Sequence, residues 1–321
     1  MMKRLVLPAL IGFICVTASV AQPYPNRPLR FILPYPPGGG ADVIGRMLAE
    51  KLAESLGQSV VVDNRPGAGG NIGMALVAKS PPDGYTLALG TLAPLGLAPS
   101  LYQQLPYDPL RDFAPISLVA SAPTLLAVHP SLPVKSVSEL IAFAKAHPGK
   151  LNYSSSGTGG GGHRAGEMFN AMAGVKMVHI PYKGGSPSVL ALISNEVSLT
   201  FGTIPAVLPH VKSGKIRGIA VAGVKRSSVA PDLPTVAEAG LPGFYDEAWW
   251  GVIAPAKTPK TIIVRLNAEL VKIAHNPNMR EKLFRLGADA IGSSPEQFSD
   301  HIEAEIKRWA KLAKEIDIRA E

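Results

Sequence analysis

The chain has 321 residues, of which 46% are hydrophobic and 17% are charged. This length and composition exclude a disordered chain and indicate two domains with sizeable cores. The formal net charge is +8, but the basic residues are scattered and no aromatic–basic motif occurs. We therefore expect no nucleic-acid binding and interpret the positive surface as one that attracts anions.

Residues 1–21 have the pattern of a secretory signal peptide. A basic start precedes a short apolar run at residues 5–16, and a small-x-small cleavage site ends at Ala21. We therefore expect cleavage after Ala21 and export to the periplasm. The apolar run is too short to span a bilayer comfortably. The single cysteine, Cys15, lies within it, so the mature protein is expected to have no disulfide.

The first motif that suggests a function is a glycine-rich turn at residues 34–40. It lies between an apolar run at 29–33 and a helical pattern from about residue 41 to residue 56, which predicts a strand, a tight turn and a helix. The first turn of a helix has unpaired N–H groups and a partial positive charge. Glycines let an anion approach that backbone closely. The turn is therefore predicted to form half of an anion-binding cleft.

Further turns of this kind follow at residues 64–71, 155–163 and 183–186, and another predicted strand ends at Thr91. Each glycine-rich turn joins a predicted strand to a predicted helix. In open α/β sheets, ligands bind outside the carboxyl ends of the parallel strands. The repeated pattern therefore predicts that these turns gather around one ligand.

The alternation of strands and helices predicts an α/β fold in which each lobe is a mainly parallel sheet flanked by helices. We expect the chain to cross between two lobes near residues 116–128 and to return near 241–250. Lobe 1 is then predicted to contain residues 22–122 and 250–321, and lobe 2 residues 123–249, with a ligand cleft between them.

Signatures of enzymes and of cofactor sites are missing from the sequence. It contains no Walker A motif, no strict dinucleotide fingerprint and no Gly-x-Ser-x-Gly elbow. Its seven histidines do not have the spacing of metal ligands. We therefore expect no cofactor and no metal, and an exported α/β enzyme is the weaker alternative.

Seven motifs, spread over nearly the whole predicted mature chain, resemble those of the Bug (TctC-like) family. These are the periplasmic solute-binding proteins of tripartite tricarboxylate transporters. The motifs are Pro34-Tyr35-Pro36-Pro37-Gly38-Gly39, Asn64-Arg65-Pro66-Gly67-Ala68-Gly69-Gly70, Pro82-Asp83-Gly84-Tyr85-Thr86-Leu87, Leu105-Pro106-Tyr107-Asp108-Pro109, Pro148-Gly149-Lys150-Leu151-Asn152-Tyr153, Pro181-Tyr182-Lys183-Gly184 and Leu233-Pro234-Thr235-Val236-Ala237-Glu238-Ala239-Gly240.

The resemblance implies a two-lobed, Venus-flytrap periplasmic-binding-protein fold of type II-like architecture. It implies a monomer that closes on a small carboxylate and delivers it to membrane transporter subunits. A sensory module that presents an organic acid to a membrane receptor, such as a sensor kinase ectodomain, is the alternative. The sequence departs from the family pattern in the glycine run at 159–162 and at Ser198, where an Asp is expected.

In that family the first glycine loop and the loop after a lobe-2 strand hold carboxylates through backbone N–H groups and waters. The matching positions are Gly38, Gly39, Asp42, Gly157, Thr158 and His163. From such backbone donors we expect carboxylate recognition without a buried arginine. The predicted ligand-binding residues are Tyr35, Gly38, Gly39, Asp42, Asn71, Thr91, Leu92, Ser155, Gly157, Thr158, His163, Lys183, Phe201 and Asp246.

Several of these residues also have structural explanations. Asp42 could cap or shape the first turn, which is the favoured interpretation, and His163 could pack in the fold instead of donating to the ligand. Hydroxyl groups at strand ends, such as that of Thr91, could stabilise turns. Asp246 could bind a ligand amine. Trp249 and Trp250 could stack on an aromatic ligand, although packing at the lobe junction is favoured.

Hydrophobic neighbours of the predicted site add an expectation about the ligand. Tyr35, Leu92 and Phe201 favour a less polar or aromatic acid. Backbone donors recognise the carboxylate but do not recognise the middle of the ligand, so the sequence does not identify the acid.

Overall fold

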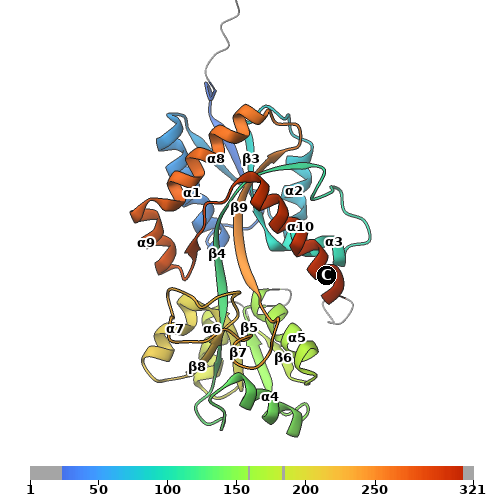
Figure 1. Cartoon of the computed structure of the whole chain (residues 1–321), viewed down its shortest axis with the longest axis vertical. Helices are drawn as coiled ribbons and strands as arrows, with labels where there is room; N and C mark the ends of the chain where they lie inside the picture. Colours follow the sequence, from blue (N-terminus) through green and yellow to red (C-terminus); the bar gives the residue numbers. More distant parts are fainter. Residues whose placement is uncertain (1–23, 158–159, 183–184, 314–321) are drawn as a thin grey trace, which may run out of the picture.

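The computed structural model describes residues 24–157, 160–182 and 185–313. The predicted signal peptide lies outside these residues. Figure 1 shows two lobes stacked along the long axis of the molecule and joined by two long strands. No helix in the described ranges is both long and apolar enough to cross a membrane.

The lobe that contains the N-terminal strands has a sheet covered by helices on both faces (Figure 1). Its parallel strands run in the order β2-β1-β3, and the two crossing strands β9 and β4 extend the sheet. The elements are β1 (Leu29–Leu33), β2 (Val60–Asn64), β3 (Thr86–Thr91), β10 (Asp289–Ala290), α1 (Gly40–Leu56), η1 (Ala68–Gly70), α2 (Asn71–Ala78), η2 (Ala93–Leu97), α3 (Ala98–Leu101), α8 (Lys260–His275), α9 (Pro277–Arg285) and α10 (Pro295–Leu312).

The second lobe is built in the same way. β5 pairs in parallel with β6 and β7, and β4 adds antiparallel partners on its side of the sheet. The elements are α4 (Val137–Ala146), β5 (Asn152–Ser155), α5 (Gly161–Ala173), β6 (Val178–Pro181), α6 (Gly185–Ile193), β7 (Leu199–Thr203), α7 (Ile204–Lys212) and β8 (Arg217–Val221).

Two strands run through both lobes, β4 (Phe113–Val128) and β9 (Glu247–Pro255). They pair antiparallel from Phe113 to Pro123, and from Thr124 onwards β4 pairs with β7 and β8 instead. The predicted parallel strands are present: β1 pairs in parallel with β2 and β3, and β5 pairs in parallel with β6 and β7. The sheets are mixed because the chain crosses between the lobes in opposite directions. The predicted limits of the lobes stay a prediction.

Short-range signals explain where the helices begin and which faces they bury. α10 begins with a capping box between Ser294 and Gln297, as the sequence predicts. The side chain of Ser136 accepts the N–H of Glu139 at the start of α4. On α1, the buried positions include four leucine or isoleucine residues at intervals of four, which form the face toward the sheet: Ile44, Leu48, Leu52 and Leu56.

One glycine on a crossing strand allows α10 to pack closely. A Cβ atom at Gly251 would lie 2.2 Å from Cζ of Phe298, and the Phe298 side chain is fully buried. We expect Gly251→Ala to destabilise the fold by about 1–3 kcal/mol through overpacking. Urea unfolding followed by circular dichroism measures this.

Gly40→Ala is the matched control, because a Cβ there meets no atom within 4 Å. It should change stability by less than about 0.5 kcal/mol. Equal effects of the two substitutions would contradict the packing explanation.

Candidate ligand-binding site

A cavity of about 420 Å³ is enclosed by residues of both lobes. The first lobe contributes the turn between β1 and α1 and the residues that follow β3. The second lobe contributes the starts of α5, α6 and α7 together with the end of β7. The crossing strands β4 and β9 supply Ala122–Thr124 and Ala248–Trp250 as a further wall. A volume of this size is typical of a small-molecule site.

Within the described part of the chain, four helices begin at this cavity. Gly40 and Ala41 of α1 line it from one lobe, and Gly161 and Gly162 of α5 line it from the other. The first residues of α6 and α7 are also part of the wall. The N–H groups of a first helical turn have no partner within the helix and carry partial positive charge. The cavity is therefore surrounded by elements that favour an anion.

Five of the predicted residues line the cavity: Tyr35, Thr91, Leu92, Phe201 and Asp246. The hydroxyl groups of Tyr35 and Thr91 are hydrogen-bonded to each other at 2.6 Å. Burial raises the pKa of Tyr35, so this phenol stays neutral at physiological pH.

The first glycine loop contacts the cavity two residues later than predicted. Gly38, Gly39 and Asp42 are not part of the wall, whereas Gly40 and Ala41 are. The carboxylate of Asp42 accepts the Gly38 N–H at 3.0 Å. It also accepts from Arg46 Nε at 3.0 Å and from Asn64 Nδ2 at 2.8 Å. Asp42 therefore shapes the turn that leads into α1.

Of the predicted residues of the third turn, the described ones are Ser155, Gly157 and His163, and none of these three is part of the cavity wall. His163 stacks on His179 with ring centroids 4.0 Å apart, and His179 is hydrogen-bonded to Ser155 Oγ at 2.7 Å. Ser155 Oγ also accepts the Gly157 N–H at 3.1 Å. Burial lowers the pKa of both imidazoles, and for His179 burial together with the neighbouring His163 lowers the pKa to about 4. Together these groups fix the turn after β5.

Three further predicted residues do not contribute to the described wall. Asn71, the first residue of α2, is buried and accepts a hydrogen bond from the Tyr107 hydroxyl at 2.6 Å. It therefore anchors a loop of the first lobe. Thr158 and Lys183 lie outside the described residues.

The sequence analysis missed Arg164, which lines the cavity and is buried. Its guanidinium donates to the fully buried carboxylate of Asp246, with Nη2 at 3.0 Å from Oδ1 and 3.1 Å from Oδ2. The wall therefore contains a buried arginine that the sequence analysis did not expect, while recognition of the carboxylate by backbone donors stays a prediction. A basic residue in the first turn of a helix is unfavourable for the helix dipole, and this was the signal available in the sequence.

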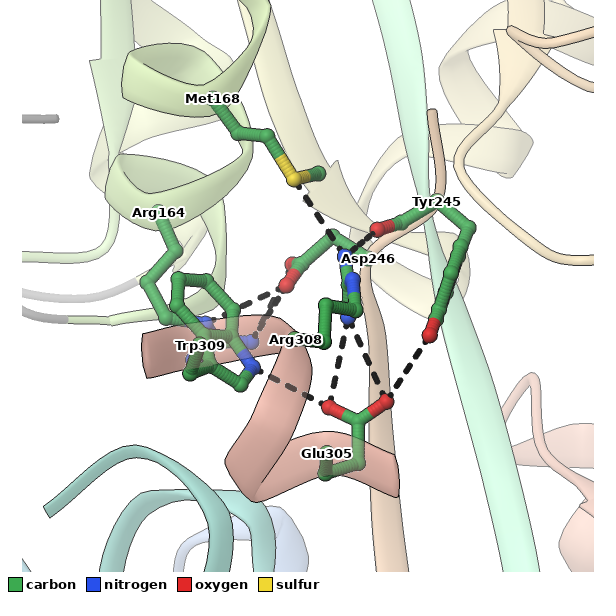
Figure 2. Close-up of polar contacts among 7 residues, drawn as sticks. All are labelled: Arg164, Met168, Tyr245, Asp246, Glu305, Arg308 and Trp309. Atoms are coloured by element: carbon green, nitrogen blue, oxygen red, sulfur yellow. Dashed lines mark hydrogen bonds and ion pairs between the residues drawn. The ribbon is translucent and has the colours of Figure 1, made fainter. Parts of the chain in front are cut away.

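A second polar cluster supports this ion pair from α10 (Figure 2). The Arg164 guanidinium lies 5.7 Å from the ring centre of Trp309, and the Trp309 indole donates to Glu305 at 3.1 Å. Arg308 donates to Glu305 and to the backbone carbonyl of Tyr245. The last turns of α10 therefore contact Arg164, the partner of Asp246, and Tyr245, the residue before Asp246.

The two tryptophans of β9 line the cavity from the lobe junction. Trp249 is 2% exposed and packs edge-to-face on Phe298 and His301 of α10. Trp250 is half-buried and packs against the core of the first lobe. The favoured prediction of packing at the lobe junction agrees with these contacts.

Comparisons with known proteins identify the class to which this architecture belongs. Residues 44–318 match the family described as "Tripartite tricarboxylate transporter family receptor". The chain is 41% identical to R. palustris Rpa4515 solved with adipate, over 91% of this chain and 97% of that one, with a TM-score of 0.76. It is 34% identical to the periplasmic binding protein BugD, over 92% and 99%, with a TM-score of 0.74.

MatC from Rhodopseudomonas palustris, solved with bound malate, is 32% identical over 90% of this chain and 100% of that one, with a TM-score of 0.74. The chain therefore belongs to the tripartite tricarboxylate transporter receptor family. The resemblance to the Bug family and the two-lobed periplasmic-binding-protein fold are confirmed. Because the family and these neighbours are solute-binding proteins, the enzyme alternative is dropped.

The Asp42 network predicts a pH dependence of stability. Hydrogen bonds, above all from Arg46, lower the pKa of Asp42 to about 2. A carboxylate with a depressed folded pKa stabilises the fold above its unfolded pKa, and the effect is lost as the pH falls through the folded pKa. We expect Asp42→Asn to lose about 1–3 kcal/mol at pH 7. The difference from wild type should shrink between pH 4 and pH 2.

Urea titrations at several pH values measure this difference, with Glu50→Gln, an exposed position on the same helix, as the control. A difference for Asp42→Asn that persists undiminished at pH 2 would contradict the role of its charge.

The Arg164–Asp246 pair predicts a second change in stability. Arg164→Met leaves a buried carboxylate unpaired and should cost about 3–5 kcal/mol. The double variant Arg164→Met/Asp246→Ala removes both charges and should recover part of that loss. Thermal or urea unfolding of the three proteins tests the coupling.

Arg285→Met is the matched control, because Arg285 forms an ion pair with Glu281 on the surface of α9 and its side chain is 75% exposed. It should cost less than about 1 kcal/mol. A double variant less stable than the single one would rule out an uncompensated charge as the cause.

Proposed function

We propose that this chain captures a small carboxylate between its lobes and delivers it to the membrane subunits of a tripartite tricarboxylate-type transporter. In this proposal the protein acts in the periplasm as a monomer, after cleavage of its signal peptide behind Ala21. The observation that carries the proposal is the cavity at which helices of both lobes begin.

The chemistry of these helix starts explains why the ligand is an acid. Backbone N–H groups make short, charge-assisted hydrogen bonds to a carboxylate, and such bonds are stronger than those between neutral groups. α1 supplies them from one lobe and α5 from the other. A ligand that contacts both sets therefore stabilises the closed arrangement over the open one.

The neighbours in the family support the same ligand chemistry. Proteins 41% and 32% identical to this chain were solved with adipate and with malate, which are both carboxylates. Family membership supports the transporter as the partner.

A thermal-shift screen of mono-, di- and tricarboxylates tests the binding function. At 100 times its dissociation constant, a ligand should stabilise the protein by about 2.7 kcal/mol. No shift with any acid of a broad panel would overturn the proposed function.

Ala41→Asp tests where the carboxylate lies. An acidic residue near the start of α1 favours the helix, so the fold should survive. Its charge would lie at the cavity wall and should repel the ligand carboxylate by about 1–3 kcal/mol. For the acid with the largest shift, calorimetry should show affinity reduced at least about tenfold.

Val43→Asp is the matched control, because it adds the same charge to the same part of α1. Val43 is 37% exposed and is not part of the cavity wall, so its substitution should change affinity less than about threefold. Equal losses for the two variants would place the carboxylate away from the start of α1.

A further inference from the structure

We propose that Thr124 selects the ligand of this cavity. Its hydroxyl binds a hydroxyl group on the carbon next to the ligand carboxylate, so the preferred ligand is a 2-hydroxy acid. This inference rests on the proposed function and names the substrate class of the same site. It follows from a buried hydroxyl group in the wall that has no hydrogen-bond partner within the described part of the chain.

Buried polar atoms without a partner are rare in proteins, and two of those in the described residues belong to the cavity wall. They are Thr124 Oγ1 and Trp249 Nε1, and their residues are 6% and 2% exposed. A buried donor or acceptor without a partner is costly. The wall therefore contains groups that gain a hydrogen bond if the ligand supplies one.

Thr124 is the one of the two whose polar atom can turn toward a ligand. The Trp249 indole is packed edge-to-face against Phe298 and His301 of α10. Thr124 lies on β4, and strands accept more than one χ1 rotamer. Its Oγ1 is covered by protein, while its methyl Cγ2 lies near Gly161 of the wall. A rotation by one rotamer step places the hydroxyl where the methyl lies, and it breaks no hydrogen bond of this hydroxyl to a described residue.

The position of Gly161 brings this hydroxyl close to the proposed position of the carboxylate. Gly161 is the first residue of α5 and lines the cavity, so its backbone belongs to a helix start that is proposed to hold the acid. A Cβ atom at Gly161 would lie 3.8 Å from Thr124 Cγ2 and 3.7 Å from Arg164 Nη2. A substituent on the carbon next to the carboxylate is therefore within reach of both side chains.

The groups around this position favour a hydroxyl over an amino substituent. Nε and Nη2 of Arg164 donate to Asp246, and Nη1 donates to no group among the described residues. A ligand hydroxyl can accept from Arg164, which has N–H donors only, and can also pair with Thr124. An ammonium cannot accept. The Asp246 carboxylate, which the sequence analysis considered as a partner of a ligand amine, is fully buried and accepts three contacts of 3.0–3.2 Å from Arg164.

Three series of acids that differ only at the second carbon test this inference. They are succinate, malate and aspartate; adipate, 2-hydroxyadipate and 2-aminoadipate; and 3-phenylpropanoate, 3-phenyllactate and phenylalanine, with both enantiomers of each substituted acid. Calorimetry on the mature chain gives the dissociation constants. In a series that binds, one enantiomer of the hydroxy acid should bind about 2- to 10-fold tighter than the unsubstituted acid, the value of one hydrogen bond, and tighter than the amino acid.

Thr124→Val tests the residue, because valine has a similar shape and lacks the hydroxyl. The hydroxyl has no partner to lose among the described residues, so the melting temperature of the ligand-free protein should not fall. The advantage of the hydroxy acid over the unsubstituted acid should disappear, while the affinity for the unsubstituted acid should change less than about twofold. Thr86→Val is the matched control, because Thr86 lies on β3 outside the cavity wall, and it should leave the advantage unchanged.

The outcomes separate this inference from the proposed function. If the hydroxy acids bind no tighter than the unsubstituted acids, or if the amino acids bind tightest, the inference is wrong while the binding function stands. If Thr124→Val keeps the advantage of the hydroxy acid, another group recognises the hydroxyl and the inference fails. A lower melting temperature of ligand-free Thr124→Val would assign the hydroxyl a structural role and contradict the inference. If only another class of acid shifts the melting temperature, the inference fails and the function stands. If no acid binds, both fail.

Discussion

The buried ion pair between Arg164 and Asp246 is the interaction on which the site depends. It joins the first turn of α5 to the segment that enters β9, two parts of the chain 82 residues apart. Its groups are almost fully buried, so neither charge can be left alone without a large penalty. The pair therefore fixes the position of the α5 start relative to the crossing strand, and with it the shape of the cavity.

Under the proposed function, the helix starts recognise the charge of the ligand, and the rest of the wall contacts its remaining part. Because the two charges in the described wall cancel, the proposed attraction for a carboxylate would come from the starts of helices and not from a net positive pocket. Helix starts act over one turn only, so under the proposed function they would fix the position of the acid group.

The sequence predicted the features that depend on neighbouring residues. The capping box of α10 and the glycine turn before α1 are visible because turn and cap residues lie a few positions apart. The wall residues Gly40 and Ala41 were missed by two positions, because Asp42 folds back onto the Gly38 N–H. The partnership of Arg164 with Asp246 was missed because it forms only when distant segments meet.

The last turns of α10 give the fold an additional property. α10 packs on the core of the first lobe through Phe298 and Ile302, but its Arg308 reaches the Tyr245 carbonyl and the Met168 sulfur beside the core of the second lobe. α10 therefore contacts both lobes and links them at their junction. A rotation of one lobe against the other must therefore break the contacts of Arg308 or move the end of α10 with the second lobe. These contacts of Arg308 lie outside the cavity wall, so they oppose movement between the lobes without contacting the site.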